Sequence, residues 1–580
     1  DHDIQTTTAE NLAKYSKIEA FAREQGIIFH PAGEGIGHQL MVERGFVHPG
    51  SLVVASDSHS NMYGALAVVG TPVVRTDAAA IWATGTTWWQ VPRSIKVTLE
   101  GRLRPNVTGK DVIITLCGLY NNEEVLNAAV ELGGPGVASL AMSERLAIAN
   151  MSAEWGALVG WFPFDGVTAA YLRQRAARLA ELGIGDRLTF DMIAGWEADP
   201  PAPDADAAYA AEILLDLSAV TPCVAGPDTV LASRPVAEIA REQVRVHKAY
   251  LLSCVNGRLD DLAAAAGVLR GKQVAAGVKL FVAAASREIQ SEAERLGIWQ
   301  DLLAAGAIAL PSGCGACIGL GAGLLEPGEV GISATNRNFK GRMGARDAQA
   351  YLASPAVVAA SARAGTITGP AEVAGDGPGY RYRELGGGSE PRAVEVVTGF
   401  PGEIRGRLLF LPADNLNTDG IYGKDVTYRD DLTPAQMATY VMANYDPGFQ
   451  AMAQEGDIIV GARNFGTGSS REQAATALKY RGIQMVIAAS FSQTYLRNAF
   501  NNAFICLESP ALVAAAREAF GARASAGERT IVAEELVVDI RRSLATWRGC
   551  EYPLGPLGPA AQELILAGGL EALTRKKLAG

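Results

Sequence analysis

The sequence has few cysteines and no long apolar run, and each of these features excludes a class of protein. Seven cysteines scattered among 580 residues are too few for the disulfide framework of a small secreted protein, so a reducing compartment is expected. No run of about 18 uninterrupted apolar residues is present, which predicts no transmembrane helix. Apolar residues make up 48% and charged residues 19% of the chain, which is typical of a globular protein and excludes disorder throughout.

Basic residues are also in the minority. The chain has 51 Lys and Arg against 62 Asp and Glu, which gives a formal net charge of −11. This balance disfavours nucleic acid or an anionic membrane surface as a partner, but allows a small anionic substrate if Arg and Lys form a local pocket. The first residues, Asp1-His2-Asp3-Ile4, lack the charged and apolar regions of a signal peptide. We therefore expect a cytoplasmic protein, or a mitochondrial-matrix protein whose presequence has been removed.

Two stretches interrupt an otherwise regular α/β pattern. Residues 197–208 (EADPPAPDADAA) predict an exposed connection, and residues 375–392 (GDGPGYRYRELGGGSEPR) predict an interdomain linker. Elsewhere, short apolar runs followed by helix-like stretches predict buried parallel strands. The predicted strands are 51–55, 249–253, 279–283, 457–460 and 484–488, and the predicted helices are 259–269, 287–296 and 470–480. Ligands of such sheets bind beyond the carboxyl ends of the strands, so polar residues at those ends are candidates for chemistry.

Three cysteines stand where a metal centre could form. Cys254 follows a predicted strand, and Cys314 and Cys317 form a C-x-x-C in a glycine-rich turn. Structural zinc usually has four protein ligands, whereas three thiolates better suit an iron–sulfur cubane with one iron left open. The remaining cysteines lie in ordinary apolar or loop contexts: Cys117, Cys223, Cys506 and Cys550. Because C-x-x-C alone is a weak signal, a thioredoxin-like redox pair, structural zinc and a simple turn stay open at this point.

Histidines and aspartates gather near the N-terminus. His2, His38 and His59 are three of the six histidines in the chain, and Asp57 and His59 directly follow the predicted strand 51–55. A carboxylate beside an imidazole fixes its tautomer and raises its basicity. These residues therefore predict an oriented acid–base group in the crevice, with hydrogen-bonded core or turn residues as the alternative.

Two further segments could receive an anion. Arg337 and Arg342 lie shortly after the C-x-x-C turn and could bind carboxylates bidentately, although a solvated basic turn is the alternative. Residues 466–472 precede a predicted helix, whose N-terminus offers free backbone N–H groups to an anion. Ser469 and Glu472 also fit an S-x-x-E capping box, and spacing alone favours this structural role for Ser469.

Together these segments resemble the aconitase superfamily over essentially the whole chain, and its homoaconitase branch more than its aconitase or 3-isopropylmalate dehydratase branches. The likeness is carried by Asp1–Gln5, Ala55–Tyr63, Gly70–Asp77, Trp82–Pro92 and Thr418–Tyr422. It implies an α/β fold with three α/β/α domains around an iron–sulfur cluster and a C-terminal α/β swivel domain, joined by a linker, that closes over it. The implied boundaries are 1–93 for an N-terminally incomplete first domain, 94–222, 223–374 with the cluster cysteines, 375–392 for the linker and 393–580 for the swivel domain.

The resemblance also implies an activity. It is that of a hydro-lyase moving a hydroxyl between adjacent carbons of a tricarboxylate through a cis-alkene, from homoaconitate to homoisocitrate in lysine biosynthesis. Residues 422–428 lack the Pro that usually follows the Tyr in homoaconitases. A related dehydratase acting on an isopropylmalate-like or specialised-metabolism substrate is therefore the alternative. The expected partner is a small tricarboxylate, with no nucleic acid and no membrane, and the expected state is a monomer. The net charge argues against an RNA-binding regulator.

Individual residues take implied roles around a [4Fe–4S] cluster that has one iron without a protein ligand. The implied cluster ligands are Cys254, Cys314 and Cys317, and the residues implied to line the cluster are Asn150, Asn256 and Asn336. His59 and Glu154 would hydrogen-bond the water or hydroxyl at the open iron, and His38 and Asp57 would form a second oriented pair.

The remaining implied roles concern proton transfer and substrate binding. Ser469 would be the base that removes the proton α to a carboxylate, and the helix N-terminus and Arg471 would lower the cost of its alkoxide. Asp1 and His2 would protonate the leaving hydroxyl. The residues implied to hold the substrate carboxylates are Arg337, Arg342, Ser470 and Arg471, with Lys424 as a further candidate.

Overall fold

The computed structural model of the chain describes residues 8–370, 380–385, 393–427, 429, 431–468 and 471–579, without the side chains of residues 424 and 425. Contacts between Cα atoms group the chain into two compact units. Unit 1 comprises Asp1–Pro72 and Pro92–Gly386, and unit 2 comprises Val73–Val91 and Gly387–Gly580. The segment 73–91 is thus grouped with the C-terminal part of the chain, and the domain boundaries given above stay predictions.

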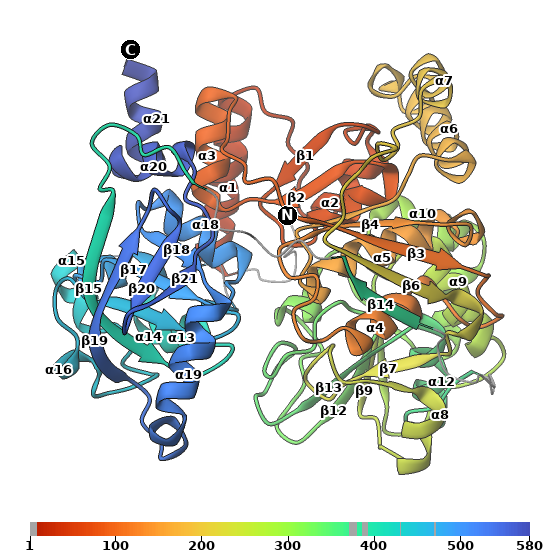
Figure 1. The fold of residues 1–580 in the computed structure, drawn as a ribbon. Helices are drawn as coiled ribbons and strands as arrows, with labels where there is room; N and C mark the ends of the chain where they lie inside the picture. Colours follow the sequence, from red (N-terminus) through yellow and green to blue (C-terminus); the bar gives the residue numbers. More distant parts are fainter. Residues whose placement is uncertain are drawn as a thin grey trace. The chain divides into compact units, whose positions relative to one another are not determined.

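Unit 1 contains three sheets, which are rich in parallel strands (Figure 1). The smallest pairs β1 (Leu52–Ala55) with β2 (Val69–Pro72) in parallel. The five-stranded sheet has the order β14 (Tyr380–Glu384), β6 (Ala211–Asp216), β3 (Ser94–Glu100), β4 (Ala129–Gly133) and β5 (Val159–Trp161). The seven-stranded sheet has the order β11 (Ile308–Ala309), β10 (Lys279–Val282), β9 (Lys248–Leu251), β12 (Val330–Ser333), β13 (Gln349–Ala353), β7 (Cys223–Ala225) and β8 (Ser233–Pro235).

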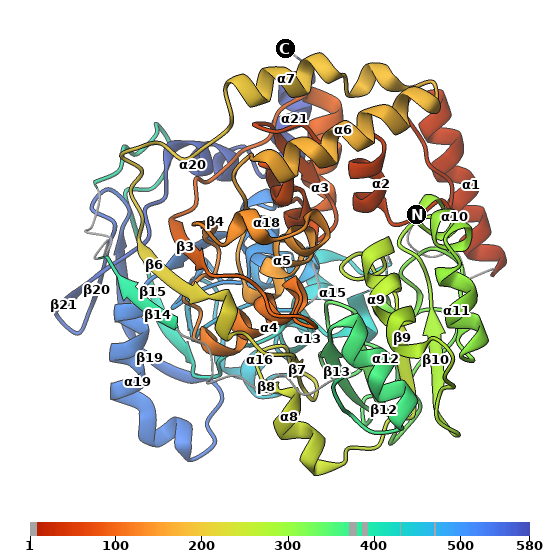
Figure 2. The same ribbon diagram turned by 90° about the vertical axis from the view of Figure 1, so that its right-hand side faces the viewer.

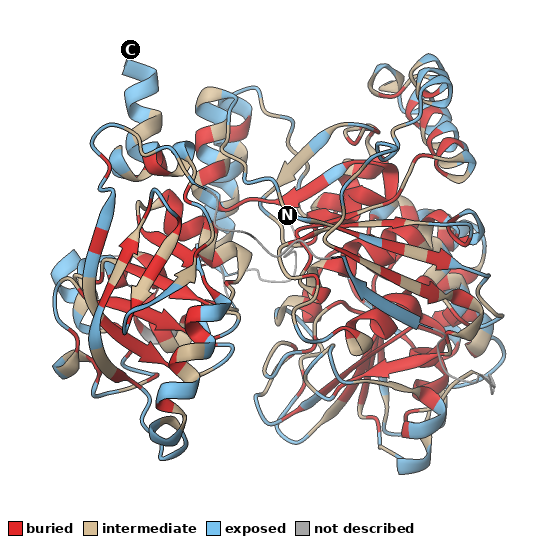
Figure 3. Ribbon diagram, viewed as in Figure 1, coloured by how far each residue is buried: buried red, intermediate tan, exposed pale blue. Residues whose placement is uncertain are grey.

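Helices connect and flank the strands of these sheets. The helices of unit 1 are α1 (Ala9–Glu24), α2 (Gly37–Glu43), α4 (Gly109–Leu119), α5 (Met142–Trp155), α6 (Gly166–Glu181), α7 (Phe190–Ala198), α8 (Val236–Ile239), α9 (Leu259–Leu269), α10 (Arg287–Arg295), α11 (Ile298–Ala304) and α12 (Pro355–Ala364). Helices α9 and α12 pack against each other beside β9 (Figure 2). Every residue of β9 is buried, as Figure 3 shows for the interior strands of this sheet, which explains the continuous apolar run.

Unit 2 is built on one seven-stranded sheet. Its order is β18 (Ile505–Glu508), β17 (Met485–Ala488), β16 (Ile458–Gly461), β15 (Glu403–Leu411), β19 (Ile531–Asp539), β20 (Leu544–Trp547) and β21 (Cys550–Pro553). The strands from β15 to β18 are parallel, and β19 to β21 extend the sheet antiparallel. Its helices are α3 (Arg75–Thr84), α13 (Thr418–Ile421), α14 (Lys424–Thr427), α15 (Pro434–Thr439), α16 (Phe449–Met452), α17 (Gln473–Tyr480), α18 (Gln493–Asn501), α19 (Pro510–Ser525), α20 (Pro559–Leu566) and α21 (Leu570–Ala579).

A buried polar network attaches the segment 73–91 to the rest of unit 2. Asp77, on α3, accepts hydrogen bonds from the guanidinium of Arg497 and from the side-chain amide of Asn501 on α18. The Arg497 guanidinium also lies 4.2 Å from the centre of the Trp88 ring. Asp77 is fully buried, so its charge depends on these partners.

The α/β class and the predicted strands are confirmed, within one or two residues at each end. Helix α9 has the predicted bounds, and β16, α17 and β17 form the predicted parallel βαβ unit. The connection predicted at 197–208 is confirmed for residues 199–208, which are mostly exposed between α7 and β6, whereas residues 197 and 198 belong to α7.

Two local predictions need comment. The boundary between the two units falls inside the predicted linker, between residues 386 and 387, but the middle of that stretch is β14, an edge strand paired with β6. Its alternating Tyr and Arg residues explain this, because the rings of Tyr380 and Tyr382 lie 6.1 and 5.8 Å from that of Tyr120. The remaining linker residues, 375–379 and 386–392, lie outside the described residues. The predicted capping box of Ser469 and Glu472 is wrong, because Glu472 is itself the N-cap residue of α17 rather than its third helical residue. The Glu472 carboxylate instead accepts a hydrogen bond from the Thr76 hydroxyl.

Candidate active site

The candidate site of unit 1 is assembled from strand ends and from one helix. Asp57 and His59 follow β1, and His38 lies on α2. Asn150 and Glu154 lie one turn apart on α5, so they share a face of the helix. Three further segments complete the set: Cys254 after β9, the turn with Cys314 and Cys317, and Asn336 with Arg337 after β12. The strand-end rule placed three of these residues from the sequence, which are Asp57, His59 and Cys254.

The three cysteines are buried close to one another. Cys254, Cys314 and Cys317 expose 3%, 5% and 3% of their surface. The side-chain amide of Asn336 links two of them, since its Nδ2 lies 3.4 Å from the Cys254 Sγ and its Oδ1 lies 3.4 Å from the Cys317 Sγ. The Nδ2 of Asn150 lies 3.3 Å from the Cys254 Sγ. Two of the asparagines predicted to line the cluster thus contact the sulfurs.

The chemistry of this donor set fits a polynuclear centre better than a single ion. Burial raises the pKa of the thiols of Cys254, Cys314 and Cys317, so metal binding would be needed to stabilise the thiolates. Structural zinc usually has four protein ligands, whereas three thiolates suit an iron–sulfur cluster in which each thiolate binds a different iron and one iron stays open. Among the described residues, no group of three or more His, Cys, Asp or Glu side chains is placed to hold a single metal ion.

A charged network lies beside the asparagines. The Oε1 atom of Glu154 accepts a hydrogen bond from the Nε of Arg337 at 2.6 Å and lies 3.0 Å from the Nε2 of His59. On its other side the His59 ring has its Nδ1 3.3 Å from the Asp57 Oδ1. The Nδ1 of His38 lies 3.6 Å from the same carboxylate oxygen. Asp57 therefore lies between the imidazoles of His38 and His59.

Opposite charges hold this network together. Burial alone would raise the pKa of Glu154, but the charges of His59 and Arg337 outweigh it and lower the pKa. Burial would likewise lower the pKa of His59, but the charge of Glu154 and hydrogen bonds to Asp57 and Glu154 raise it overall. The structure therefore favours an anionic Glu154 beside a protonated His59.

Two of the predicted residues, Asn256 and Arg342, donate hydrogen bonds to a helix carboxylate and to a backbone carbonyl rather than to a cysteine sulfur. The Nδ2 of Asn256 donates to Asp261 in the first turn of α9 at 2.9 Å, and its Oδ1 is buried without a hydrogen-bond partner. The Nε of Arg342 donates to the carbonyl oxygen of Cys317 at 2.7 Å. Arg342 thus holds the backbone of Cys317.

The predicted residues of unit 2 are described only in part. Arg471 is 6% exposed and its guanidinium pairs with Asp419. Its Nε is buried and has no hydrogen-bond partner among the residues that the structure describes. The remaining predicted residues lie outside the described residues or, for Lys424, have an undescribed side chain: Asp1, His2, Lys424, Ser469 and Ser470.

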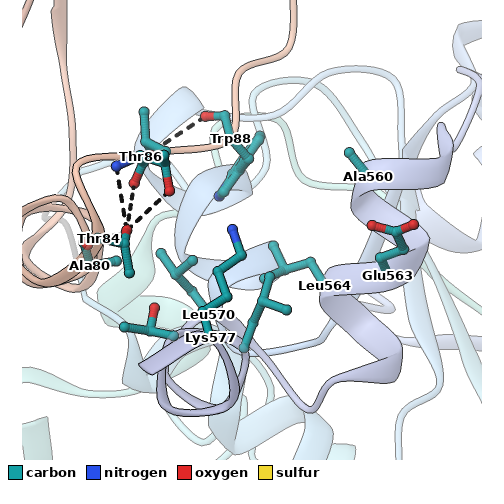
Figure 4. Close-up of a pocket in the computed structure, with 12 residues that line it drawn as sticks. Ala80, Thr84, Thr86, Trp88, Ala560, Glu563, Leu564, Leu570 and Lys577 are labelled. Atoms are coloured by element: carbon teal, nitrogen blue, oxygen red, sulfur yellow. Dashed lines mark hydrogen bonds between the residues drawn. The ribbon is translucent and has the colours of Figure 1, made fainter. Parts of the chain in front are cut away.

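A separate hollow in unit 2 lacks such chemistry. It has a volume of about 170 Å³ and lies between the end of α3 with the segment after it and helices α20 and α21 (Figure 4). Its described lining includes Trp88, Leu564 and Leu570, with Glu563 and Lys577 as charged residues and neither histidine nor cysteine. This hollow offers no acid–base group or metal ligand comparable with those of unit 1.

One residue beside the site was missed by sequence reasoning. Lys110 is fully buried and its Nζ donates to the carbonyl oxygen of Thr335, the residue before Asn336. Its position in the first turn of a helix, where acidic residues are favoured, is the one signal in the sequence that could have drawn attention to it.

Comparisons with known proteins show the family of the chain. Residues 1–365 match the aconitase family (aconitate hydratase), and residues 387–512 match the aconitase C-terminal domain. The chain is 52% identical to the mitochondrial homoaconitase of Eremothecium gossypii, over all of this chain and 88% of that protein. It is 48% identical to the corresponding proteins of Mycosarcoma maydis and Yarrowia lipolytica, over all of this chain and 86% and 87% of theirs.

These matches place the chain among the hydro-lyases that depend on an iron–sulfur cluster. The chain belongs to the aconitase family. Among the described residues, no helix combines the length and apolar character needed to cross a membrane.

Proposed function

We propose that this protein is a homoaconitase, which interconverts homoaconitate and homoisocitrate in lysine biosynthesis by the α-aminoadipate route. The observation that carries the proposal is the joint presence of three buried cysteines and a His–Asp–Glu–Arg network in a chain about half identical to homoaconitases along its whole length. The reaction adds water across the cis-alkene of homoaconitate, or removes it from homoisocitrate, so that one carbon gains or loses a hydroxyl and its neighbour a proton, without any redox change.

We further propose that Cys254, Cys314 and Cys317 hold a [4Fe–4S] cluster with one iron free of protein ligands. The close approach of Asn150 and Asn336 to the sulfurs supports this, since hydrogen bonds to thiolate sulfur stabilise such clusters. The partnerless Oδ1 of Asn256 leaves one more polar atom available in the buried surroundings of Cys254. When bound, the cluster supplies a Lewis acid that polarises the carbon–oxygen bond to be broken or formed.

The residues of the network would manage protons and carboxylates. Protonated His59, held between Glu154 and Asp57, has a proton available on an oriented ring. Arg337 donates its Nε–H to Glu154, which leaves the N–H groups of its two terminal nitrogens for a substrate carboxylate. His38 shares Asp57 with His59 and would be the second oriented imidazole.

Other roles rest on the family resemblance. Ser469 would take the proton α to a carboxylate, and Asp1 and His2 would protonate the leaving hydroxyl. Ser470, Arg471, Arg342 and Lys424 would bind the carboxylates. The buried, partnerless Nε of Arg471 supports a further contact for that guanidinium. Because the relatives are named as mitochondrial proteins, we propose the mitochondrial matrix as the compartment in place of the cytoplasm expected from the sequence.

The substrate is tested directly with anaerobically reconstituted full-length protein. Homoaconitate is supplied, and the loss or gain of alkene absorbance is followed, with an isopropylmalate-type substrate as the comparison. Hydration of homoaconitate at a clearly higher kcat/KM is expected. If a sample with full iron and sulfide content acts on the isopropylmalate-type substrate and leaves homoaconitate unchanged, the related dehydratase is the correct assignment.

A further inference from the structure

Lys110 is a buried cation in an unfavourable place. It is the second residue of α4, where the exposed N–H groups of the helix already make the local potential positive. Its side chain is fully buried, and removing an ammonium group from water carries a further cost. A lysine retained in such a place needs a compensating interaction nearby.

No carboxylate directly provides that compensation. Among the described residues, the Lys110 ammonium donates to a backbone carbonyl oxygen and forms no ion pair with a carboxylate. Asp111, its neighbour in the chain, accepts instead from the backbone N–H groups of Thr108 and Cys223. Burial lowers the pKa of Lys110 to about 8. Four acidic groups oppose this effect, because their negative charges raise the pKa of Lys110: Glu154, Cys317, Asp261 and Asp111. Two of these four belong to the candidate active site.

The hydrogen bond of Lys110 also connects it to the candidate active site. Its Nζ donates to the carbonyl oxygen of Thr335, and the Thr335 hydroxyl lies 2.9 Å from the hydroxyl of Ser333 at the end of β12. The next two residues are Asn336, which contacts two sulfurs, and Arg337, which pairs with Glu154. The ammonium therefore fixes the backbone from which both side chains extend.

We propose that Lys110 is a positioning residue of the cluster site, which holds the turn of Asn336 and Arg337 and supplies a buried positive charge that balances the cluster and its thiolates. The inference rests on the proposed iron–sulfur function, because a bound cluster is the anion that Lys110 otherwise lacks. According to this proposal, Lys110 affects the reduction potential of the cluster, because that potential depends on nearby charge. Lys110 also affects substrate affinity, because it fixes the position of Arg337.

Two neutral variants separate the charge from the hydrogen bond. Lys110→Met removes both, whereas Lys110→Gln retains a donor that can reach toward the Thr335 carbonyl without the charge. Lys248 provides a matched control, because it is also buried, donates to a backbone carbonyl at 2.7 Å and pairs with Glu329 at 2.6 Å. It starts β9, whereas Cys254 follows the far end of that strand.

The readouts are the midpoint potential of the cluster, followed by electron paramagnetic resonance during a redox titration, and the KM for homoaconitate. We expect both Lys110 variants to shift the midpoint potential to more negative values. A nearby positive charge stabilises the reduced cluster, which is more negative, more than the oxidised cluster, so its removal disfavours reduction. We expect the KM to rise about tenfold in Lys110→Met, the effect of losing one hydrogen bond to a charged group, and to rise less in Lys110→Gln. Lys248→Met should leave the potential unchanged.

The outcomes distinguish this inference from the proposed function. If the unaltered protein binds no iron and sulfide, the proposed function itself fails. If it binds the cluster but neither Lys110 variant changes the potential relative to Lys248→Met, the role of Lys110 is refuted. Neutral side chains are easier to bury than an ammonium group, so both variants should fold. Misfolding of both Lys110 variants, while Lys248→Met folds, would also contradict the inference. The Lys110 cation would then be required for folding itself, whether or not a cluster is bound.

Discussion

Replacing Glu154 with Gln tests the network beside the sulfurs, because a single carboxylate oxygen serves two partners. The Oε1 atom lies 2.6 Å from the Nε of Arg337 and 3.0 Å from the Nε2 of His59. Gln has nearly the same shape, so its carbonyl oxygen can still accept one of these hydrogen bonds. The substitution thus removes the negative charge with little change in packing.

The expected size of the effect follows from these two contacts. A hydrogen bond to a charged group contributes about 1.5–3 kcal/mol, roughly twice the value for a neutral pair. Making the shared acceptor neutral should therefore cost about 2–3 kcal/mol of the interaction that orients Arg337 and keeps His59 protonated. If the network is used in the transition state, kcat/KM falls by about 30- to 150-fold.

The assay follows the alkene absorbance with homoaconitate, in samples matched for iron and sulfide. Glu144→Gln is the control, because Glu144 lies in the first turn of the same helix and accepts the N–H of Ala141 at 2.7 Å. The control should retain activity close to that of the unaltered protein. A Glu154→Gln protein with a full cluster and a kcat/KM within about threefold of the unaltered protein would refute the reasoning.

Three further predictions test other parts of the structure. Replacing any one of the cluster cysteines with Ser should abolish binding of iron and sulfide, whereas Cys117→Ser on α4 should retain both; metal analysis decides between these results. The lowered pKa of Glu154 gives stability that is lost as the pH falls below its ordinary 4.5, and the raised pKa of His59 gives stability that is lost as the pH rises above its ordinary 6.5. The difference in melting temperature between the unaltered protein and Glu154→Gln should accordingly be greatest between these values, and a constant difference across pH would contradict the ion pair. Asp77→Asn should destabilise unit 2 by about 3–5 kcal/mol, because it leaves a buried guanidinium without its carboxylate, while the exposed Asp414→Asn should cost less than about 1 kcal/mol; urea unfolding measures both, and equal effects would contradict the buried network.

Strand ends made much of the site predictable from the sequence. Asp57, His59 and Cys254 each follow an apolar run that forms a buried strand, so the rule for parallel sheets predicted their place. Glu154 was implied by the family resemblance alone, because a carboxylate inside a helix has no distinctive local pattern. The structure adds that it meets His59 and Arg337 across large sequence separations.

Long-range packing explains what sequence reasoning missed. The Tyr and Arg residues of β14 are surrounded by Gly and Pro, and only the edge of the five-stranded sheet makes them a strand. Lys110 looks like an ordinary helical lysine until the fold buries it against the Thr335 carbonyl. The start of α17 was misjudged because the partner of Glu472 is Thr76, about 400 residues earlier in the chain.

The most direct test of the central claim is the iron, sulfide and zinc content of anaerobically prepared full-length protein, together with its visible spectrum. A [4Fe–4S] cluster on Cys254, Cys314 and Cys317 predicts about four iron and four sulfide per chain and a broad charge-transfer absorption. Zinc without iron or sulfide would contradict the proposed centre and the mechanism built on it.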